Sequence, residues 1–148
     1  MLYKRKYIPK KKRTEKQNVD AELWRVFSLW IRQRDTDENG YVKCISCGRI
    51  IHWREGGNCH AGHFYSQGGH KSVKYHEKNV HCQCFNCNMN LEGNKQGYAL
   101  GLEERYGKGI LDELLICKNN KSKLFLNEKK LLIKDYIRRL EEAGYETV

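Results

Sequence analysis

Apolar residues recur at helical spacing in two stretches, one near the beginning of the chain and one near its end. Residues 19–35 carry apolar side chains at i, i+3, i+4, i+7 and i+8, which predicts an amphipathic helix whose stripe faces the core. Asn18 or Asp20 is expected to cap this helix. Residues 127–144 predict a second amphipathic helix, which ends at Gly144. The stripes consist of Leu23, Val26, Phe27, Trp30 and Ile31 in the first helix and Leu131, Ile133, Tyr136, Ile137 and Leu140 in the second.

The pattern between these helices is shorter in period and more polar. Residues 41–53, YVKCISCGRIIHW, follow a DENG turn signal and predict two short strands joined by a cysteine-containing turn. Residues 55–78 contain five glycines and indicate a loop-rich segment. Helical character returns after Cys84, and residues 102–115 predict one short helix that is broken or bent near Gly107 and Gly109. The pattern therefore predicts a small α+β domain.

The length of 148 residues is that of one domain. We expect a basic flexible arm at residues 1–17, a helix and a metal-stapled domain at 18–117, and a C-terminal helical extension of that domain at 118–148. No run approaches the roughly 18 apolar residues of a membrane span, and the first residues lack the apolar stretch of a secretory signal. We therefore expect a cytoplasmic protein with reduced thiols, in which seven cysteines favour metal binding over disulfides.

The net charge of +10, from 28 Lys and Arg against 18 Asp and Glu, favours a polyanionic partner, most often nucleic acid. The alternative is that the excess charge only keeps the protein soluble. The N-terminal arm and the segment 68–78, GGHKSVKYHEK, are the most basic stretches and are expected to meet DNA. The candidate contacts to DNA are Lys10, Lys11, Lys12, Arg13, Lys71, Lys74, Lys78, His81 and Lys95.

Two Cys-x2-Cys pairs predict a structural zinc site. Cys44 and Cys47 form the first pair, and Cys84 and Cys87 form the second. Four thiolates at this spacing favour a closed tetrahedral Zn²⁺ site that ties two parts of the chain together and has no open position for substrate. The alternative is that these are unpaired cysteines in a reduced core. Cys82 competes with Cys84 as a ligand but lacks an x2 partner.

A second constellation lies between the two cysteine pairs. His60, His63, Asn79 and Asn88 supply groups that can bind a divalent cation and move a proton. Hydrolysis of a phosphodiester needs both, because a water must lose a proton as it attacks and charge on the phosphate must be neutralised. A neutral imidazole is a suitable base near pH 7. The alternative for the two histidines is a structural role, with each ring bonded to the backbone.

The spacing resembles that of HNH, or ββα-metal, nucleases, in which the first His ends a strand, the middle Asn lies in a loop and the last Asn opens a helix. The whole pattern is similar to the NinG (Rap) family of phage recombination proteins. This resemblance implies a zinc-stapled ββα-metal fold, binding and cutting of branched DNA such as Holliday junctions and D-loops, and the host cytoplasm as location. It runs from about residue 23 to residue 107 and rests on FSLWIRQRD (27–35), GYVKCISCG (40–48), HAGHF (60–64), KNVHCQCFNCN (78–88), EGN (92–94) and YG (106–107).

Resolvases of the endonuclease VII type offer a second resemblance, which implies roles for individual residues. His63 would be the general base, with Asn79 as its orienting partner in the catalytic centre. His60 and Asn88 would hold a catalytic Mg²⁺ or Mn²⁺. His60 stands where those resolvases have an acidic ligand, and an imidazole ligand favours the softer Mn²⁺.

Two other classes of function remain open from the sequence. The first is a zinc-containing recombination protein that binds branched DNA without cutting it. The second is a protein–protein adaptor of the RING or LIM type, although such modules use eight ligands for two zinc ions and this chain has one complete set. A four-way junction has two equivalent strands to cut, which favours a homodimer, and the terminal amphipathic helix is the expected interface.

Overall fold

A computed structural model describes residues 10–146. Its helices are α1 (Glu15–Arg34), α2 (Lys95–Tyr106), α3 (Ile110–Asn119) and α4 (Leu126–Glu142), and its strands are β1 (Tyr41–Lys43), β2 (Ile50–His52), β3 (Cys59–His63) and β4 (Val80–Cys84). Short helical turns lie at Glu55–Gly57, Lys71–Val73 and Asn86–Asn90, the last of them a π-helix. The α+β class predicted from the sequence is confirmed. No helix in the described range has the length and apolar character that a membrane crossing needs.

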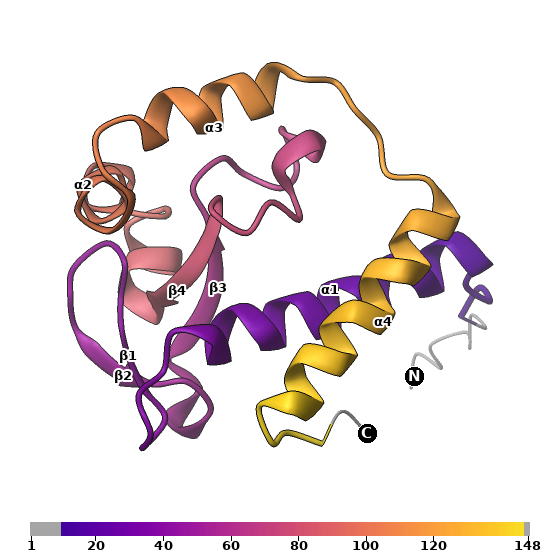
Figure 1. Ribbon diagram of the computed structural model, residues 1–148, viewed down its shortest axis with the longest axis horizontal. Helices are drawn as coiled ribbons and strands as arrows, with labels where there is room; N and C mark the ends of the chain where they lie inside the picture. Colours follow the sequence, from indigo (N-terminus) through magenta and orange to yellow (C-terminus); the bar gives the residue numbers. More distant parts are fainter. Residues whose placement is uncertain (1–9, 147–148) are drawn as a thin grey trace, which may run out of the picture.

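The four strands form two separate antiparallel pairs. β1 pairs with β2, and β3 pairs with β4 in a register that sets His63 opposite Val80. The predicted hairpin at 41–53 is confirmed. The pair β3–β4 was not predicted from the residue pattern, because both strands are covered on two sides and their sequence does not alternate. Figure 1 shows β3 and β4 at the centre, with α2 and α3 beyond one side and α1 on the other.

Helix α1 begins earlier than expected. Thr14 caps it through a reciprocal pair of bonds: its hydroxyl accepts from the Gln17 amide at 3.2 Å, and the Gln17 side chain accepts from the Thr14 amide at 3.0 Å. The expected caps at Asn18 and Asp20 are therefore wrong. The first nine residues of the basic arm lie outside the described residues, and its last three residues belong to α1.

The apolar stripe of α1 is buried, as predicted, and α4 lies across it (Figure 1). Phe27 meets Tyr136 of α4 edge to face, with ring centroids 5.2 Å apart. Leu140 of α4 and Val80 of β4 complete this core. The apolar stripe of the terminal helix therefore packs within the chain rather than at an intermolecular interface, although Leu131 is 66% exposed. A homodimer remains a prediction without that interface.

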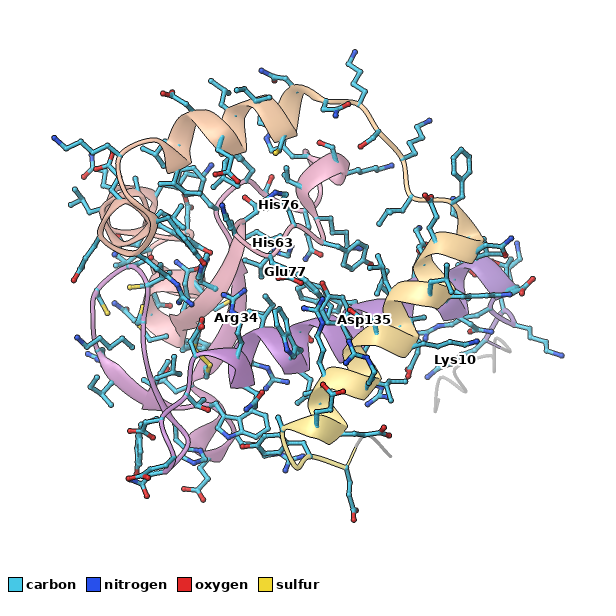
Figure 2. The ribbon with its side chains drawn as sticks, viewed as in Figure 1. Lys10, Arg34, His63, His76, Glu77 and Asp135 are labelled. Atoms are coloured by element: carbon cyan, nitrogen blue, oxygen red, sulfur yellow. A yellow bond between two sulfur atoms is a disulfide. The ribbon has the colours of Figure 1, made fainter. Side chains whose placement is uncertain are left out.

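Hydrogen bonds from Arg34 fix the C-terminal end of α1 to the rest of the fold. Arg34 donates to the backbone oxygens of Glu77 at 2.9 Å and Val80 at 3.2 Å, which anchors the helix to the chain entering β4 (Figure 2). The Glu77 carboxylate in turn accepts from Arg139 of α4 at 2.8 Å. Glu77 therefore joins the β4 approach to both helices.

The region after the second cysteine pair agrees in part with its prediction. The helix expected at 102–115, broken or bent near Gly107 and Gly109, is broken there into α2 and α3, and Gly107 has a φ of +89°. α2 also starts at Lys95, earlier than expected, because Asn94 caps it in the left-handed region and accepts from the Gly97 amide. Leu102, Ile110 and Leu114 form a separate small core there.

Candidate functional site

The four paired cysteines come together as one cluster. Their Sγ atoms all lie within 4.8 Å of one another, and those of Cys47 and Cys84 are 3.8 Å apart. A tetrahedral Zn²⁺ site with Zn–S bonds of about 2.3 Å has sulfur–sulfur edges of roughly 3.8 Å, so this donor set fits zinc. The sequence prediction that these four residues form a single metal-binding group is confirmed.

The surrounding backbone explains why the cluster forms. Gly48 follows the first pair with a φ of +74°, a conformation that glycine adopts without strain. Cys84 ends β4, and the π-helical turn Asn86–Asn90 brings Cys87 back beside it. Burial raises the pKa of the Cys87 thiol to about 12, so metal uptake near neutral pH releases protons.

Cys59 and Cys82 form a disulfide that joins β3 to β4, with Cα atoms 5.9 Å apart. The sequence analysis expected reduced thiols here, with Cys82 a competitor for zinc. The register explains the difference. Cys59 lies opposite Cys84 and Cys82 lies opposite Ala61, so the two sulfurs are diagonal neighbours on one face of the hairpin.

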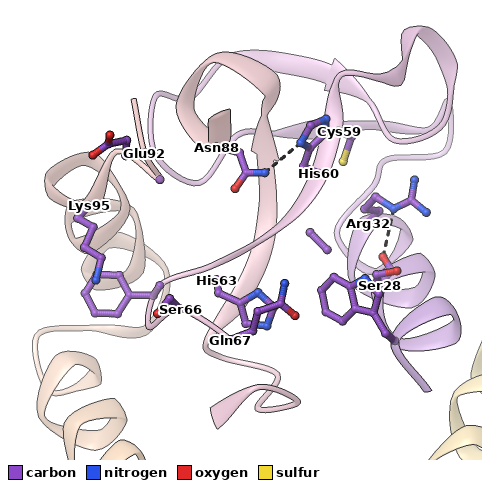
Figure 3. A pocket seen from close by; sticks show the side chains of 14 residues that line it. Ser28, Arg32, Cys59, His60, His63, Ser66, Gln67, Asn88, Glu92 and Lys95 are labelled. Carbon is purple, nitrogen blue, oxygen red and sulfur yellow. Dashed lines mark hydrogen bonds between the residues drawn. The ribbon is translucent and has the colours of Figure 1, made fainter. Parts of the chain in front are cut away.

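A pocket of about 560 Å³ opens over β3. Figure 3 shows His60 and His63 in its middle, with Arg32 of α1 on one side and Lys95 of α2 on the other. Asn88 of the π-helical turn also lines it. Three of the four residues of the predicted second constellation therefore share one pocket.

His63 is the last residue of β3, and its ring is held on two sides. Nε2 lies 2.9 Å from the backbone oxygen of Lys74. Because a carbonyl oxygen only accepts, Nε2 must carry the hydrogen, and Nδ1 of the neutral ring keeps its lone pair. The ring also stacks on Trp24 of α1, with centroids 5.2 Å apart. Burial lowers the pKa of His63, with a smaller opposing effect from the Lys74 carbonyl, so the ring is neutral at pH 7.

His60 and Asn88 face each other in the pocket, with Asn88 Nδ2 3.0 Å from His60 Nδ1 (Figure 3). Rotation of the Asn88 amide by half a turn would place its Oδ1 beside the same imidazole nitrogen. One imidazole nitrogen and one amide oxygen fit a divalent ion that takes its remaining ligands from phosphate and water.

Asn79 lies outside the pocket, fully buried before β4. Its side chain donates to the backbone oxygens of Tyr65 at 3.1 Å and Val73 at 3.0 Å, and it accepts from the Tyr65 amide at 2.9 Å. These bonds close the loop between β3 and β4. That loop carries Lys74, the acceptor for His63, so Asn79 can orient the His63 ring only indirectly.

The predicted DNA contacts divide into surface and interior positions. Lys10 to Arg13 and Lys71 are exposed, and Lys95 lies over the rings of Phe64 and Tyr65 at the pocket wall. Lys74 lies over Tyr75, and Lys78 is paired with Glu113 at 2.9 Å. His81 is 1% exposed, enclosed by two tyrosines. Its predicted contact with DNA is therefore wrong, because its ring does not reach the surface.

The sequence analysis missed two parts of the pocket. One wall consists of Trp24, Ser28 and Arg32, which follow at i, i+4 and i+8 on α1. That spacing places the three residues on one helix face and could be read from the sequence. The interpretation of this helix was based on its neighbouring apolar stripe instead. The other part is Glu92, a carboxylate at the pocket with a left-handed φ of +50°. It brings an acidic group to a site where the sequence offered only neutral ligands.

Comparison with known proteins places this arrangement in a family. The family model described as Bacteriophage Lambda NinG protein matches residues 3–146. Protein ninG of Escherichia phage lambda is 27% identical over 122 residues, which cover 78% of this chain and 57% of that protein. Protein ninG of Salmonella phage P22 is 31% identical over 94 residues, which cover 59% of this chain and 44% of that protein.

The chain spans about half the length of these relatives. No solved structure matches it. The family model covers nearly the whole sequence, so the resemblance to this family is confirmed: the chain belongs to the NinG family.

Proposed function

We propose that this protein is a metal-dependent endonuclease of the HNH type that cuts branched recombination intermediates such as Holliday junctions and D-loops. The order of parts supports an HNH-like ββα-metal core. His63 ends β3, Asn79 directly precedes β4, and Asn88 lies in the helical turn that follows. The choice of branched DNA rests on the family resemblance and on the basic composition.

The observation that carries the proposal is the state of His63. Its Nε2 hydrogen is engaged by the Lys74 oxygen, so the free lone pair is on Nδ1, and the ring lines the same pocket as His60 and Asn88. A neutral, fixed imidazole that shares a pocket with two candidate cation ligands suits hydrolysis of a phosphodiester.

In the proposed reaction, His63 Nδ1 takes a proton from water as the water oxygen attacks phosphorus. The bond between phosphorus and the leaving ester oxygen breaks, and the leaving oxygen acquires a proton from solvent. A Mg²⁺ or Mn²⁺ ion on His60 and Asn88 would supply charge neutralisation at the phosphate. The zinc ion on the four cysteines would stabilise the fold, because four thiolates leave it no open position.

The test compares the wild type with His63→Ala on four-way, flap and linear duplex DNA in Mg²⁺ and in Mn²⁺. We expect the wild type to nick the branched substrates and His63→Ala to lose a factor of roughly 10² to 10⁴ in rate, the usual contribution of a general base. His52→Ala is the matched control, because its ring accepts from the backbone amides of Arg54 and Glu55 and lies outside both the pocket and the basic segment 68–78. Equal cutting by His63→Ala and the wild type would refute the assignment of the base.

The pH profile gives an independent check. His63 must be neutral to accept a proton, and burial lowers its pKa below 6.5. The midpoint of the fall in rate at acid pH should therefore lie below pH 6.5, and the rate should be nearly level above pH 7. A rate that still rose steeply between pH 7 and 8 would point to a different base.

The second candidate function is binding of branched DNA without cleavage. The pair His60 and Asn88 favours it, because two neutral ligands bind a hard cation weakly in the absence of phosphate. Junction binding without nicks in either metal ion would support this function and refute the first. Absence of DNA binding at any salt concentration would instead favour the adaptor function.

A further inference from the structure

Arg32 of α1 differs from the other arginines of the described helices. Its Nε donates to the backbone oxygen of Ser28 at 3.2 Å, and within residues 10–146 no carboxylate pairs with its guanidinium. The remaining helical arginines each have a carboxylate within about 3 Å: Arg25, Arg34, Arg105, Arg138 and Arg139. Arg32 is therefore the exception among the arginines of the described helices.

The surroundings of Arg32 make its positive charge unfavourable in the free protein. Burial, with repulsion from Arg54, lowers the pKa of its guanidinium. A partly buried cation without a counter-ion is costly, and such groups are normally paired. Within residues 10–146 its charge is unpaired and faces the pocket, where an anionic ligand would neutralise it.

The position of Arg32 points to the kind of ligand. It lines the pocket over β3, on the wall opposite Lys95, with His60 and His63 between the two cations (Figure 3). A guanidinium forms two parallel hydrogen bonds with the oxygens of a phosphate, and the pocket of about 560 Å³ has room for one.

We propose that Arg32 is a phosphate-binding residue of this pocket and holds the backbone of the bound DNA strand on the α1 side, while Lys95 holds it on the α2 side. The strand then passes over His60 and His63 between two fixed cations. The identity of the phosphate as part of DNA rests on the proposed function. The anion site itself rests on the unpaired guanidinium in the pocket.

Arg32→Gln tests the proposal, with Arg25→Gln as the control. Both substitutions remove one positive charge from α1, but Arg25 pairs with Glu22 outside the pocket. Binding to a four-way junction is measured in Ca²⁺ over a range of salt concentrations. We expect Arg32→Gln to bind roughly tenfold more weakly and to reduce the slope of log K against log [salt] by about 0.9, the value for one phosphate contact. Arg25→Gln should keep the wild-type slope.

Thermal unfolding separates binding from a structural role. Removal of an unpaired, partly buried charge should leave the melting temperature of Arg32→Gln unchanged or higher. Inorganic phosphate should raise the melting temperature of the wild type and of Arg25→Gln but not that of Arg32→Gln. An unchanged salt slope, or a melting temperature that falls while phosphate still stabilises the variant, would overturn the proposal.

The outcome is distinguishable from failure of the nuclease function. If the wild type makes no nicks in Mn²⁺ but Arg32→Gln loses one phosphate contact, the phosphate-binding site is supported and the nuclease function is refuted. If the wild type cuts junctions and the salt slope of Arg32→Gln is unchanged, the nuclease function is supported and the phosphate-binding role of Arg32 is refuted.

Discussion

His81→Gln should make the protein less sensitive to acid, and the environment of His81 gives the reason. Tyr98 donates its hydroxyl hydrogen to the Gly62 oxygen at 2.8 Å, so it must accept from His81 Nδ1 at 3.3 Å. Nε2 of the neutral ring then accepts from the Tyr106 hydroxyl at 2.8 Å. The neutral histidine is satisfied on both nitrogens inside the core.

The size of the effect follows from the pKa of this group. Burial, together with repulsion from Arg34 and Arg105, lowers the pKa of His81 to about 2. The unfolded chain has a histidine pKa of about 6.5, so below that pH the unfolded state takes up a proton that the folded state does not. His81 therefore costs no stability above pH 7. It costs about 1.4 kcal/mol for each pH unit below 6.5, or about 2 kcal/mol between pH 7 and pH 5.

The assay is urea unfolding of the wild type and His81→Gln at pH 7 and pH 5 with a fixed excess of zinc. The other titrating groups and the metal site are common to both proteins, so they cancel in the difference between the two pH dependences. The variant is expected to be less stable at pH 7, because glutamine replaces the ring imperfectly, but to lose about 2 kcal/mol less on acidification. Equal losses in the two proteins would refute the reasoning.

Two further predictions concern the cysteine cluster and its support. Cys84→Ser should abolish retention of one zinc per chain after gel filtration, measured by atomic emission, whereas Cys117→Ser, outside the cluster, should keep it. Gly101→Ala would place a methyl group 1.9 Å from a backbone oxygen of the first cysteine turn and should cost about 1–3 kcal/mol in urea unfolding. Gly109→Ala has open space at its Cβ and serves as the control, so equal losses in both variants would contradict the packing argument.

Predictions from the sequence were correct where one local pattern decides the structure. The stripe on α1, the hairpin β1–β2 and the four-cysteine cluster each follow from a spacing of a few residues, and each is confirmed. The start of α1 was misplaced because Thr14 and Gln17 cap it reciprocally, a signal that was present but lies within a basic segment.

The rest depends on contacts between distant parts of the chain. The burial of His81 follows from two tyrosines of α2, which lie 17 and 25 residues further on. The hydrogen on His63 Nε2 is assigned by the backbone oxygen of Lys74, and no residue pattern specifies such a bond. The helix face that carries Arg32 could be found from the spacing of Trp24, Ser28 and Arg32. The lack of a carboxylate partner for Arg32 is visible only in the folded structure.

The crossing of α4 over α1 has a consequence for synthesis of the protein. α1 supplies one wall of the pocket, yet the helix that covers its apolar stripe is made some 90 residues later. At about 5–20 residues per second, α1 leaves the ribosome several seconds before α4 exists. During that interval its stripe is available to chaperones or to neighbouring nascent chains. Burial of the α1 stripe is therefore complete only after α4 has been translated.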